Sequence, residues 1–320
     1  MILMAKVQNS STKNDDVIGE LPLACADEKA AVEFMEKQRW DDAPCCPTCG
    51  DMSVYQMKDS KTGERQANYR WRCNGCKDQF TVRKGTVLED SRIPLRHWCF
   101  AFWRAATSKK GVSALEIHRQ TGLSYKSSLF LLNRIRHAMN DDTPTPLSGT
   151  VEVDEVFIGG KPRKGQGGKM RGKREKTAVI GMLERGGKVR TAPVPNVNGD
   201  TLRAVMKKHI DFTNSTLMTD EYISYRAIGR EFKRGHQTVN HSKNEYVRGD
   251  ATTNRIEGFF SLVRRSIDGI YHNVSVEHLP KYLAECSFRY GNRDLTDGER
   301  TVAAIRAGIG KHLTYEESKA

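Results

Sequence analysis

The chain has 320 residues, with 52 lysines and arginines against 39 aspartates and glutamates, a net charge of +13 and a pI near 9.4. This length allows two or three compact units with at least one sizeable core. No apolar run approaches the roughly 18 residues of a membrane span, and the polar start argues against a secretory signal. The basic excess favours a polyanionic partner such as nucleic acid, but a solubilising basic surface would explain it equally well.

The front of the chain predicts a loose leader and then a small metal-binding domain. Residues 1–26 begin with a largely polar stretch, which is typical of a loose leader. Residues 27–40 carry apolar side chains at near-helical spacing, which predicts a short amphipathic helix. Together with the cysteine pairs that follow, this helix defines an expected domain at residues 27–90.

Two Cys-x-x-Cys pairs predict a structural zinc site. The pairs are Cys46 with Cys49 and Cys73 with Cys76, separated by 23 residues that contain alternating, hairpin-like runs. Two such pairs on neighbouring hairpins bring four thiolates into a tetrahedron, which suits Zn²⁺ and leaves no open position for water. Four ordinary buried cysteines are the alternative, although unrelated cysteines rarely form two matched pairs. The pattern fits a reducing cytoplasm better than a disulfide scaffold.

Residues 91–140 predict a helix-turn-helix domain. After a first helix from about residue 95, a short helix and a longer one flank a tight turn at 121–124. Gly122 in the turn and Ser124 as the N-cap match a helix-turn-helix. The second helix would offer Lys126, Arg134 and Arg136 to phosphates or base edges. A plain helical hairpin used for packing or dimerisation is the alternative.

A linker near residues 140–146 precedes a larger α/β domain at 147–295. Three consecutive strands followed by alternating helices and strands describe a mixed sheet with helices on its faces. The predicted strands are 149–158, 177–184, 188–194, 215–219 and 236–241, and the predicted helices are 199–210, 221–232 and 252–268. Residues 296–320 are expected to form a C-terminal tail.

A basic loop separates the first two of these strands. Residues 161–176 hold eight basic side chains and one acidic one, with several glycines and almost no apolar anchor. Such a loop is able to order on a phosphate backbone, although a simply solvated loop is the alternative. The candidate DNA contacts in it are Lys161, Arg163, Lys164, Lys169, Arg171, Lys173 and Arg174.

Three acidic residues carry the catalytic hypothesis. Asp154 lies within the first strand, Asp220 closes the fourth, and Glu257 lies on the last predicted helix. Carboxylates from strands and a later helix are able to converge on two divalent metal ions, an arrangement used for in-line attack on phosphodiesters. Each acid also has an ordinary interpretation, since Asp220, for example, would serve as a helix cap. The three together, in this order and on this sheet, favour a metal site.

These motifs resemble bacterial insertion-sequence transposases of the DDE type, in the group with a zinc ribbon and a helix-turn-helix before a ribonuclease H-like catalytic domain. The resemblance covers about residues 30–295. The stretches that carry it are Tyr69–Cys76, Val153–Lys161, Thr219–Tyr222, Thr253–Phe259 and Phe288–Tyr290. It implies an enzyme that binds the ends of an insertion sequence, cuts DNA strands and joins them to a target.

The same resemblance implies a ligand set for two Mg²⁺ or Mn²⁺ ions. Asp154 and Asp220 match the first two ligands, and the third position in relatives is Glu or Asn. Asn254 and Glu257 are both present here, and we favour Glu257 because an anionic ligand neutralises Mg²⁺ better than an amide. Asn254 stays an alternative.

Two further residues are candidates for a role near the metal site, one from the resemblance and one from its position in the sequence. Arg264, seven residues after Glu257, matches a basic residue expected to contact DNA near the break. His241, at the end of the preceding predicted strand, is a possible catalytic alternate, with a purely structural histidine as the competing interpretation. Double-stranded DNA is the expected partner. The expected oligomeric state is a homodimer or a larger assembly, and the expected location is the bacterial cytoplasm, in association with the nucleoid.

Other functions remain open from the residues alone. A non-catalytic DNA-binding regulator would use the zinc ribbon and the helix-turn-helix but would have no need of the acids. A metal-dependent nuclease or junction resolvase would use the same fold without joining strands. Serine and tyrosine recombinases would depend on a hydroxyl nucleophile instead of on carboxylates.

Overall fold

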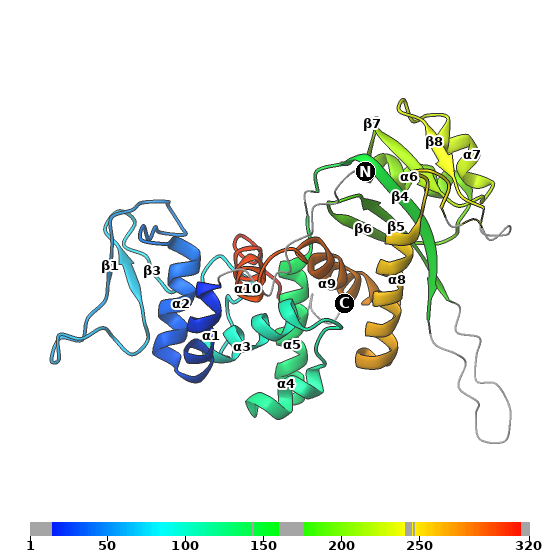
Figure 1. Cartoon of the computed structure of the whole chain (residues 1–320). Helices are drawn as coiled ribbons and strands as arrows, with labels where there is room; N and C mark the ends of the chain where they lie inside the picture. Colours follow the sequence, from blue (N-terminus) through cyan, green and yellow to red (C-terminus); the bar gives the residue numbers. More distant parts are fainter. Residues whose placement is uncertain (1–14, 143, 160–175, 241–244, 246, 315–320) are drawn as a thin grey trace, which may run out of the picture. The chain divides into compact units, whose positions relative to one another are not determined.

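The computed structural model describes residues 15–142, 144–159, 176–240, 245 and 247–314 (Figure 1). The chain forms two compact units. Unit 1 contains the residues up to 140 together with those from 292 onward, and unit 2 contains residues 141–291. Each unit has its own core and is described by itself below. No helix in the described ranges is both long enough and apolar enough to cross a membrane.

Unit 1 begins with two helices and a small sheet. Helix α1 (Asp16–Ala26) occupies the last 11 residues of the stretch 1–26 expected to be a loose leader, and buried Leu21 and Ala24 anchor it. Helix α2 (Glu28–Trp40) matches the predicted helix, and the Asp27 side chain caps its N-terminus. The strands β1 (Val54–Gln56), β2 (Trp71–Cys73) and β3 (Gln79–Phe80) then form an antiparallel sheet in that order.

Four further helices complete unit 1. They are α3 (Leu95–Thr107), α4 (Ala114–Thr121), α5 (Tyr125–Met139) and α10 (Asp297–Arg306). The region expected to be a C-terminal tail therefore contains a helix, which begins with a capping box formed by Thr296 and Glu299. Helix α10 packs against α3, α2, α1 and α5, so the chain returns to the first unit after completing the second.

Unit 2 is built on a five-stranded mixed sheet in the order β6-β5-β4-β7-β8. The long strand β4 lies at its centre, antiparallel to β5 and parallel to β7. At the two sides, β6 is antiparallel to β5 and β8 is parallel to β7. The strands are β4 (Leu147–Ile158), β5 (Thr177–Glu184), β6 (Val189–Val194), β7 (Ile210–Thr219) and β8 (His236–Thr238).

Helices cover both faces of this sheet. On one face α6 (Gly199–His209) and α7 (Ser224–Gly229) bury a core that includes Val151 and Val153 of β4. On the other face α8 (Asn254–Ser266) and α9 (Leu279–Gly291) bury a core that includes Val156 and Ile158. The π-helix η3 (Ile267–Tyr271) extends α8. Because side chains alternate along a strand, Asp154 lies on the α8 face and Glu155 on the α7 face.

Unit 2 differs from the prediction by the helix α9, which was not predicted, and by the lengths of other elements. Strand β7 begins at Ile210, five residues before the predicted strand, directly at the end of α6. Helix α7 is six residues long, shorter than the predicted helix at 221–232. The mixed sheet with helices on its faces, predicted from the order of elements, is confirmed.

Candidate functional site

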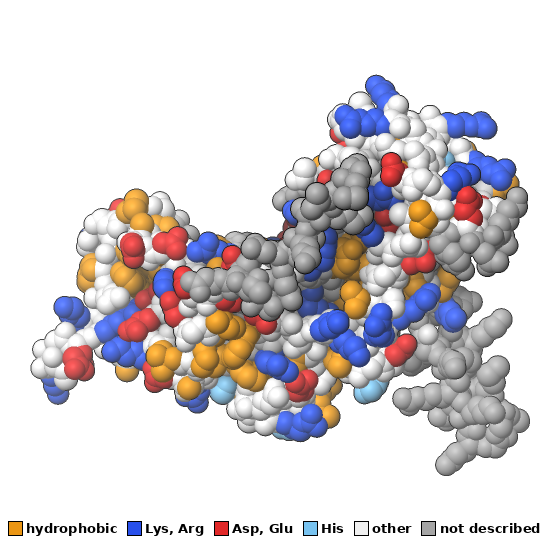
Figure 2. Space-filling view, in the orientation of Figure 1, with side chains coloured by type: hydrophobic (Ala, Val, Ile, Leu, Met, Phe, Trp, Pro, Cys, Tyr) orange, Lys and Arg blue, Asp and Glu red, His pale blue; other side chains and the backbone are white. Residues whose placement is uncertain are grey.

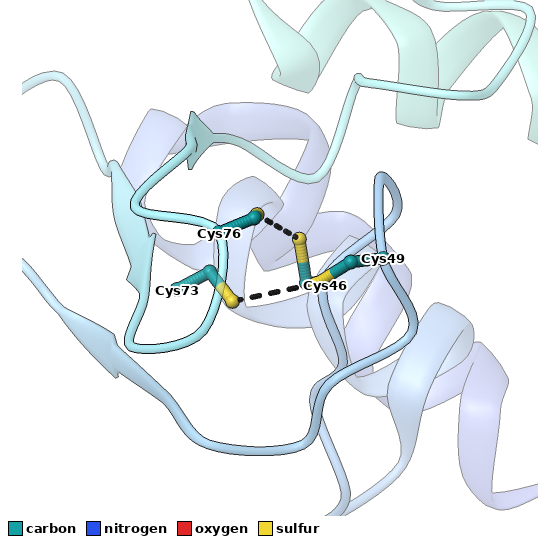
Figure 3. Close-up of side chains that lie close together, drawn as sticks. All are labelled: Cys46, Cys49, Cys73 and Cys76. Carbon is teal, nitrogen blue, oxygen red and sulfur yellow. Dashed lines mark hydrogen bonds between the residues drawn. The ribbon is translucent and has the colours of Figure 1, made fainter.

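The four predicted zinc ligands lie together in unit 1 (Figure 3). The Sγ atoms of Cys46 and Cys76 are 3.6 Å apart, as are those of Cys49 and Cys73. Four sulfurs placed about 2.3 Å from one central ion stand nearly this far apart. Burial raises the pKa of Cys73, and its contact with Cys49 adds to this effect. Thiols held this closely need a cation to ionise together, so the cluster fits structural Zn²⁺.

Helix α2 supports the small sheet that carries these cysteines. The Trp40 ring meets the rings of Trp71 and Phe80 edge-on, with centroids 5.8 and 6.0 Å away. Glu36, only 8% exposed, accepts a hydrogen bond of 2.7 Å from the Trp71 indole and forms an ion pair with Arg65. The predicted helix therefore contacts the ribbon through Trp40 and Glu36, while it also packs against α1 and α3.

Helices α4 and α5 are joined by the tight turn that the sequence predicts. Gly122 adopts a left-handed conformation with φ of 73°, and the Ser124 side chain accepts a hydrogen bond from the backbone of Ser127. Lys126 is exposed at the start of α5. The turn chemistry is as expected, because glycine tolerates positive φ and serine caps helices well.

Two of the three basic residues predicted on α5 do not reach solvent. Arg134 and Arg136 are each 2% exposed. Arg134 donates hydrogen bonds to the backbone carbonyl oxygens of Val87 and Glu89, and so fastens α5 to the segment before α3. Both side chains face the interior of unit 1. The predicted helix alone did not reveal this orientation. We therefore keep only Lys126 as a candidate DNA contact of this helix.

The first two acids are brought together by the sheet of unit 2. In the parallel pairing of β4 with β7, Val151 lies opposite Leu217 and Glu152 lies opposite Met218. Two more residues along this register place Asp154 beside Asp220, directly after β7 ends. Both side chains are half-buried. Asp154 accepts a hydrogen bond of 2.8 Å from the Glu155 amide, and Asp220 accepts one of 3.0 Å from the Tyr222 amide.

A third carboxylate, Glu155, lies close to this pair from the other face of β4. Burial raises the pKa of Glu155 to about 7, and the charges of Asp154 and Asp220 add to the rise. The hydroxyl of Tyr225, a fully buried residue of α7, donates a hydrogen bond of 2.6 Å to Glu155 and opposes that shift. Three acids thus repel one another at this end of the sheet, and a cation there would relieve the repulsion.

A glycine allows helix α8 to approach this pair of acids. Gly181 of β5 lies opposite Asp154. A Cβ atom at this position would lie 2.5 Å from the Phe260 ring and 2.8 Å from the Ile256 side chain. The absence of a side chain therefore lets the first turns of α8 lie directly on β5, next to Asp154. Close packing at this glycine therefore sets how near the first turns of α8, which carry Glu257, come to the sheet.

The two candidates for the third ligand differ in their place on α8. The residues that face the sheet are Ile256, Phe259, Phe260 and Val263. At 100° per residue, Glu257 lies about a quarter-turn from Ile256, whereas Asn254 lies nearly opposite it. Glu257 is accordingly half-buried, and its carboxylate accepts a hydrogen bond of 2.6 Å from the Thr253 hydroxyl.

Asn254, by contrast, is exposed. Arg264 is also exposed and lies on the same flank of α8 as Glu257, because seven residues make nearly two full turns.

The acids and the thiols differ in how closely they gather. Across the described parts of the chain, the four cysteines are the one group of three or more His, Cys, Asp or Glu residues whose ligand atoms all lie within 4.8 Å of one another. The carboxylates of Asp154, Asp220 and Glu257 are therefore more widely spaced than that. Their chemistry still fits Mg²⁺ or Mn²⁺, which prefer oxygen ligands and bind through a few carboxylates while keeping several waters.

Several predicted residues lie outside the described residues. His241 is one of them, as are the basic residues of the loop between β4 and β5, namely Lys161, Arg163, Lys164, Lys169, Arg171, Lys173 and Arg174. Other exposed basic side chains are visible on unit 2. Figure 2 shows lysines and arginines gathered over the part that carries β8 and α7, and another group over α8. The exposed basic residues of those segments include Arg226, Arg230, Arg255, Arg264 and Arg265.

Comparison with known families matches two parts of this chain. Residues 146–291 match the model of the ISXO2-like transposase domain, and residues 26–79 match the transposase zinc-ribbon domain. The chain belongs to the insertion-sequence transposases. The first match spans nearly the whole of unit 2, and the second ends shortly after Cys76. The resemblance to insertion-sequence transposases with a zinc ribbon is therefore confirmed.

Two curated relatives are consistent with this assignment to the transposase family. A protein in the transposable element ISH50 of Halobacterium salinarum is 26% identical over 276 residues, which cover 82% of this chain and 90% of the relative. A transposase-like protein of Haemophilus influenzae is 29% identical over 109 residues, which cover 34% of this chain and 85% of the relative.

Sequence patterns did not reveal every residue that shapes the acidic site of this transposase. Glu155 is not among the predicted site residues, and its contact with Tyr225 joins residues 70 positions apart. Gly181 carries no side chain that a motif would highlight. The alternation of side chains along β4 was the one available signal, because it separated Glu152 and Asp154 from Glu155.

Proposed function

We propose that this transposase binds the ends of an insertion sequence, cuts DNA strands there and joins the freed 3′-hydroxyl groups to target DNA. The observation that carries the proposal is the register of the parallel strands β4 and β7, which runs on to Asp154 and to Asp220 just after β7, with the first turns of α8 packed next to Asp154. A mixed sheet with a long central strand and helices on both faces also supports a ribonuclease H-like catalytic fold.

The proposed ligands of the catalytic metal ions are Asp154, Asp220 and Glu257. Two Mg²⁺ or Mn²⁺ ions held there would activate the attacking oxygen and stabilise the leaving oxygen of a phosphodiester. Strand β4 holds Asp154 at the centre of the sheet, and the amide of Tyr222 fixes the orientation of Asp220. Thr253 orients Glu257 in the same way. We prefer Glu257 to Asn254 because it is anionic and lies nearer the sheet.

DNA contacts complete the proposal. Arg264, exposed on the flank of α8 that carries Glu257, is suited to a phosphate near the break. Lys126 at the start of α5 is suited to the end sequence, if α4 and α5 act as a helix-turn-helix. Transposition joins two ends, so we propose that two or more chains assemble on DNA in the bacterial cytoplasm.

The experiment compares the purified protein with two variants on DNA from its own locus, including both flanks, in Mg²⁺ or Mn²⁺. Asp220→Asn removes a proposed ligand, while Asp200→Asn changes a 94% exposed acid of the same unit. We expect the wild type and Asp200→Asn to nick and join strands. Asp220→Asn should bind DNA but react about a thousandfold more slowly, because loss of metal-based charge stabilisation removes several kcal/mol.

Each other result has a defined meaning. Equal reaction by Asp220→Asn and the wild type would remove Asp220 from the site and contradict the proposal. Cutting without joining, on DNA that contains both ends, would identify a nuclease on the same fold. Binding by all three proteins with no reaction in either metal would favour a DNA-binding regulator.

A further inference from the structure

Glu152 is a fully buried acid on the strand that carries Asp154. Its side chain has an exposed fraction of 0%, and it precedes Asp154 by two residues, so both lie on the α8 face of the sheet. A carboxylate removed from water is tolerated only where charges or hydrogen-bond donors surround it. The identity of those donors indicates what Glu152 does.

Both oxygens of Glu152 are used to join separate parts of unit 2. Oε1 accepts a hydrogen bond of 2.8 Å from Nε of Arg185, directly after β5. Oε2 accepts bonds from the backbone amides of Arg255 and Ile256, at 3.0 and 3.2 Å. Arg185 also donates to the carbonyl oxygen of Thr252, just before α8. One carboxylate thus connects β4, the end of β5 and the beginning of α8.

The two amides are those that a helix cap would normally satisfy. Thr253 occupies the N-cap position of α8, yet its side chain makes no capping hydrogen bond. Its hydroxyl donates to Glu257 instead. The second and third residues of the helix, Arg255 and Ile256, would therefore lack an acceptor without Glu152, which lies about a hundred positions earlier in the chain.

We propose that Glu152, with Arg185, is a positioning residue that fixes the first turn of α8 against β4 and so sets the place of Glu257 relative to Asp154. The inference rests on the proposed function, in which these two acids bind metal. Glu152 releases Thr253 from capping, and Thr253 then orients Glu257. The strand that supplies the first ligand therefore also holds the helix that supplies the third.

The test measures Mn²⁺ binding to the zinc-loaded, DNA-free protein by the electron paramagnetic resonance signal of free Mn²⁺. Glu152→Gln should weaken binding about tenfold or more, as changes in residues that support metal ligands typically do. Arg185→Gln changes a side chain that is 20% exposed, and it provides a second variant if Glu152→Gln folds poorly.

A matched control is Glu285→Gln. Glu285 is 1% exposed, pairs with Arg289 and accepts a hydrogen bond of 2.7 Å from Tyr271, so it is another buried acid of unit 2. We expect it to lower the melting temperature by an amount similar to Glu152→Gln but to leave Mn²⁺ affinity unchanged. In a Glu257→Gln background, Glu152→Gln should weaken Mn²⁺ binding little further, because the ligand that it positions is already gone.

The outcomes separate this inference from the proposed function. Wild-type Mn²⁺ affinity in both Glu152→Gln and Arg185→Gln would overturn the positioning role. Equal weakening by Glu285→Gln would also overturn it, because general loss of stability would then explain the effect. Unchanged Mn²⁺ binding in Asp220→Asn would instead contradict the proposed metal site itself.

Discussion

The cysteine cluster and the acidic cluster are assembled in different ways. Four thiols come from two short motifs within one small domain, and two pairs of sulfurs stand 3.6 Å apart. The acids come from the middle of one strand, the end of another and the first turn of a helix about a hundred residues later. The comparison teaches that local spacing is enough to predict the zinc site, whereas the proposed metal site depends on how α8 packs on the sheet.

The largest expected effect is the loss of zinc. Cys73→Ser should release the metal and unfold the ribbon, because a structural zinc ion contributes on the order of 10 kcal/mol. Zinc content and tryptophan fluorescence would report it, since Trp40 and Trp71 pack together at the sheet. Cys45→Ser is the matched control, as that cysteine lies outside the cluster. Full zinc content in Cys73→Ser would contradict the assignment.

The next largest effect is expected at Gly181, the glycine on which α8 packs. Gly181→Ala should destabilise unit 2 by about 1–3 kcal/mol, because its Cβ would press on Phe260 and Ile256 and force the helix away. Strand cleavage should fall with it, since Glu257 moves with the helix. Urea unfolding and cleavage rates provide the two measurements.

The control for this change lies in α8 itself. Gly258 has no atom within 4 Å of an added Cβ, so Gly258→Ala should be neutral or stabilise the helix by about 0.5–1 kcal/mol. If Gly181→Ala were as stable and as active as Gly258→Ala, close packing of α8 would not be what places Glu257.

Tyr225→Phe tests the acid on the other face of β4. It leaves the buried carboxylate of Glu155 without its donor, which should cost about 1–3 kcal/mol of unfolding free energy. The pKa of Glu155, about 7 and thus above the usual 4.5, should rise further because the lost hydrogen bond lowers it. Tyr222→Phe, which alters an exposed tyrosine, should change stability by less than about 0.5 kcal/mol.

The pH dependence of this effect has a definite sign. Because the folded protein raises the pKa of Glu155, the stability that its protonated form contributes is complete below about pH 4.5 and is lost as pH rises through about 7. Without added Mg²⁺ or Mn²⁺, Tyr225→Phe should therefore be more destabilising at pH 8 than at pH 5. An equal loss at both pH values would show that Glu155 does not ionise beside Tyr225.

The smallest effect is expected at Lys126, the exposed basic residue at the start of α5. Lys126→Ala should weaken DNA binding by about 1 kcal/mol. It should also lower the slope of log K against log salt concentration by about one, as the loss of a phosphate contact does. Arg134→Ala should instead lower the unfolding free energy, because it breaks two hydrogen bonds to backbone carbonyl oxygens. Filter binding across salt concentrations and thermal unfolding distinguish the two. A salt dependence unchanged in Lys126→Ala would remove it from the interface.

The sequence predicted features that depend on neighbouring residues. Cysteine spacing defined the ribbon, Gly122 and Ser124 defined the turn before α5, and strand position suggested that Asp154 and Asp220 would be neighbours. Features that depend on tertiary packing were missed. The polar start of residues 1–26 drew attention from the apolar run at their end, where Leu21 is buried in a helix. Nothing in α5 indicated that Arg134 would face inward.

The acidic cluster shows the same limit of prediction from sequence, here for two residues of one strand. Glu152 and Glu155 differ by three residues, yet one holds the start of α8 and the other meets Tyr225 of α7. Alternation along β4 separates their faces but does not identify their partners, because those partners come from loops and helices that fold onto the sheet later in the chain.

The most direct test of the catalytic proposal is anomalous X-ray scattering from crystals of the protein soaked in Mn²⁺. The account predicts Mn²⁺ bound by carboxylate oxygens of Asp154 and Asp220, with Glu257 contributing a further oxygen, and zinc alone at the four cysteines. Crystals that bind Mn²⁺ elsewhere, or that leave Asp154 and Asp220 without Mn²⁺ at saturating concentration, would contradict it.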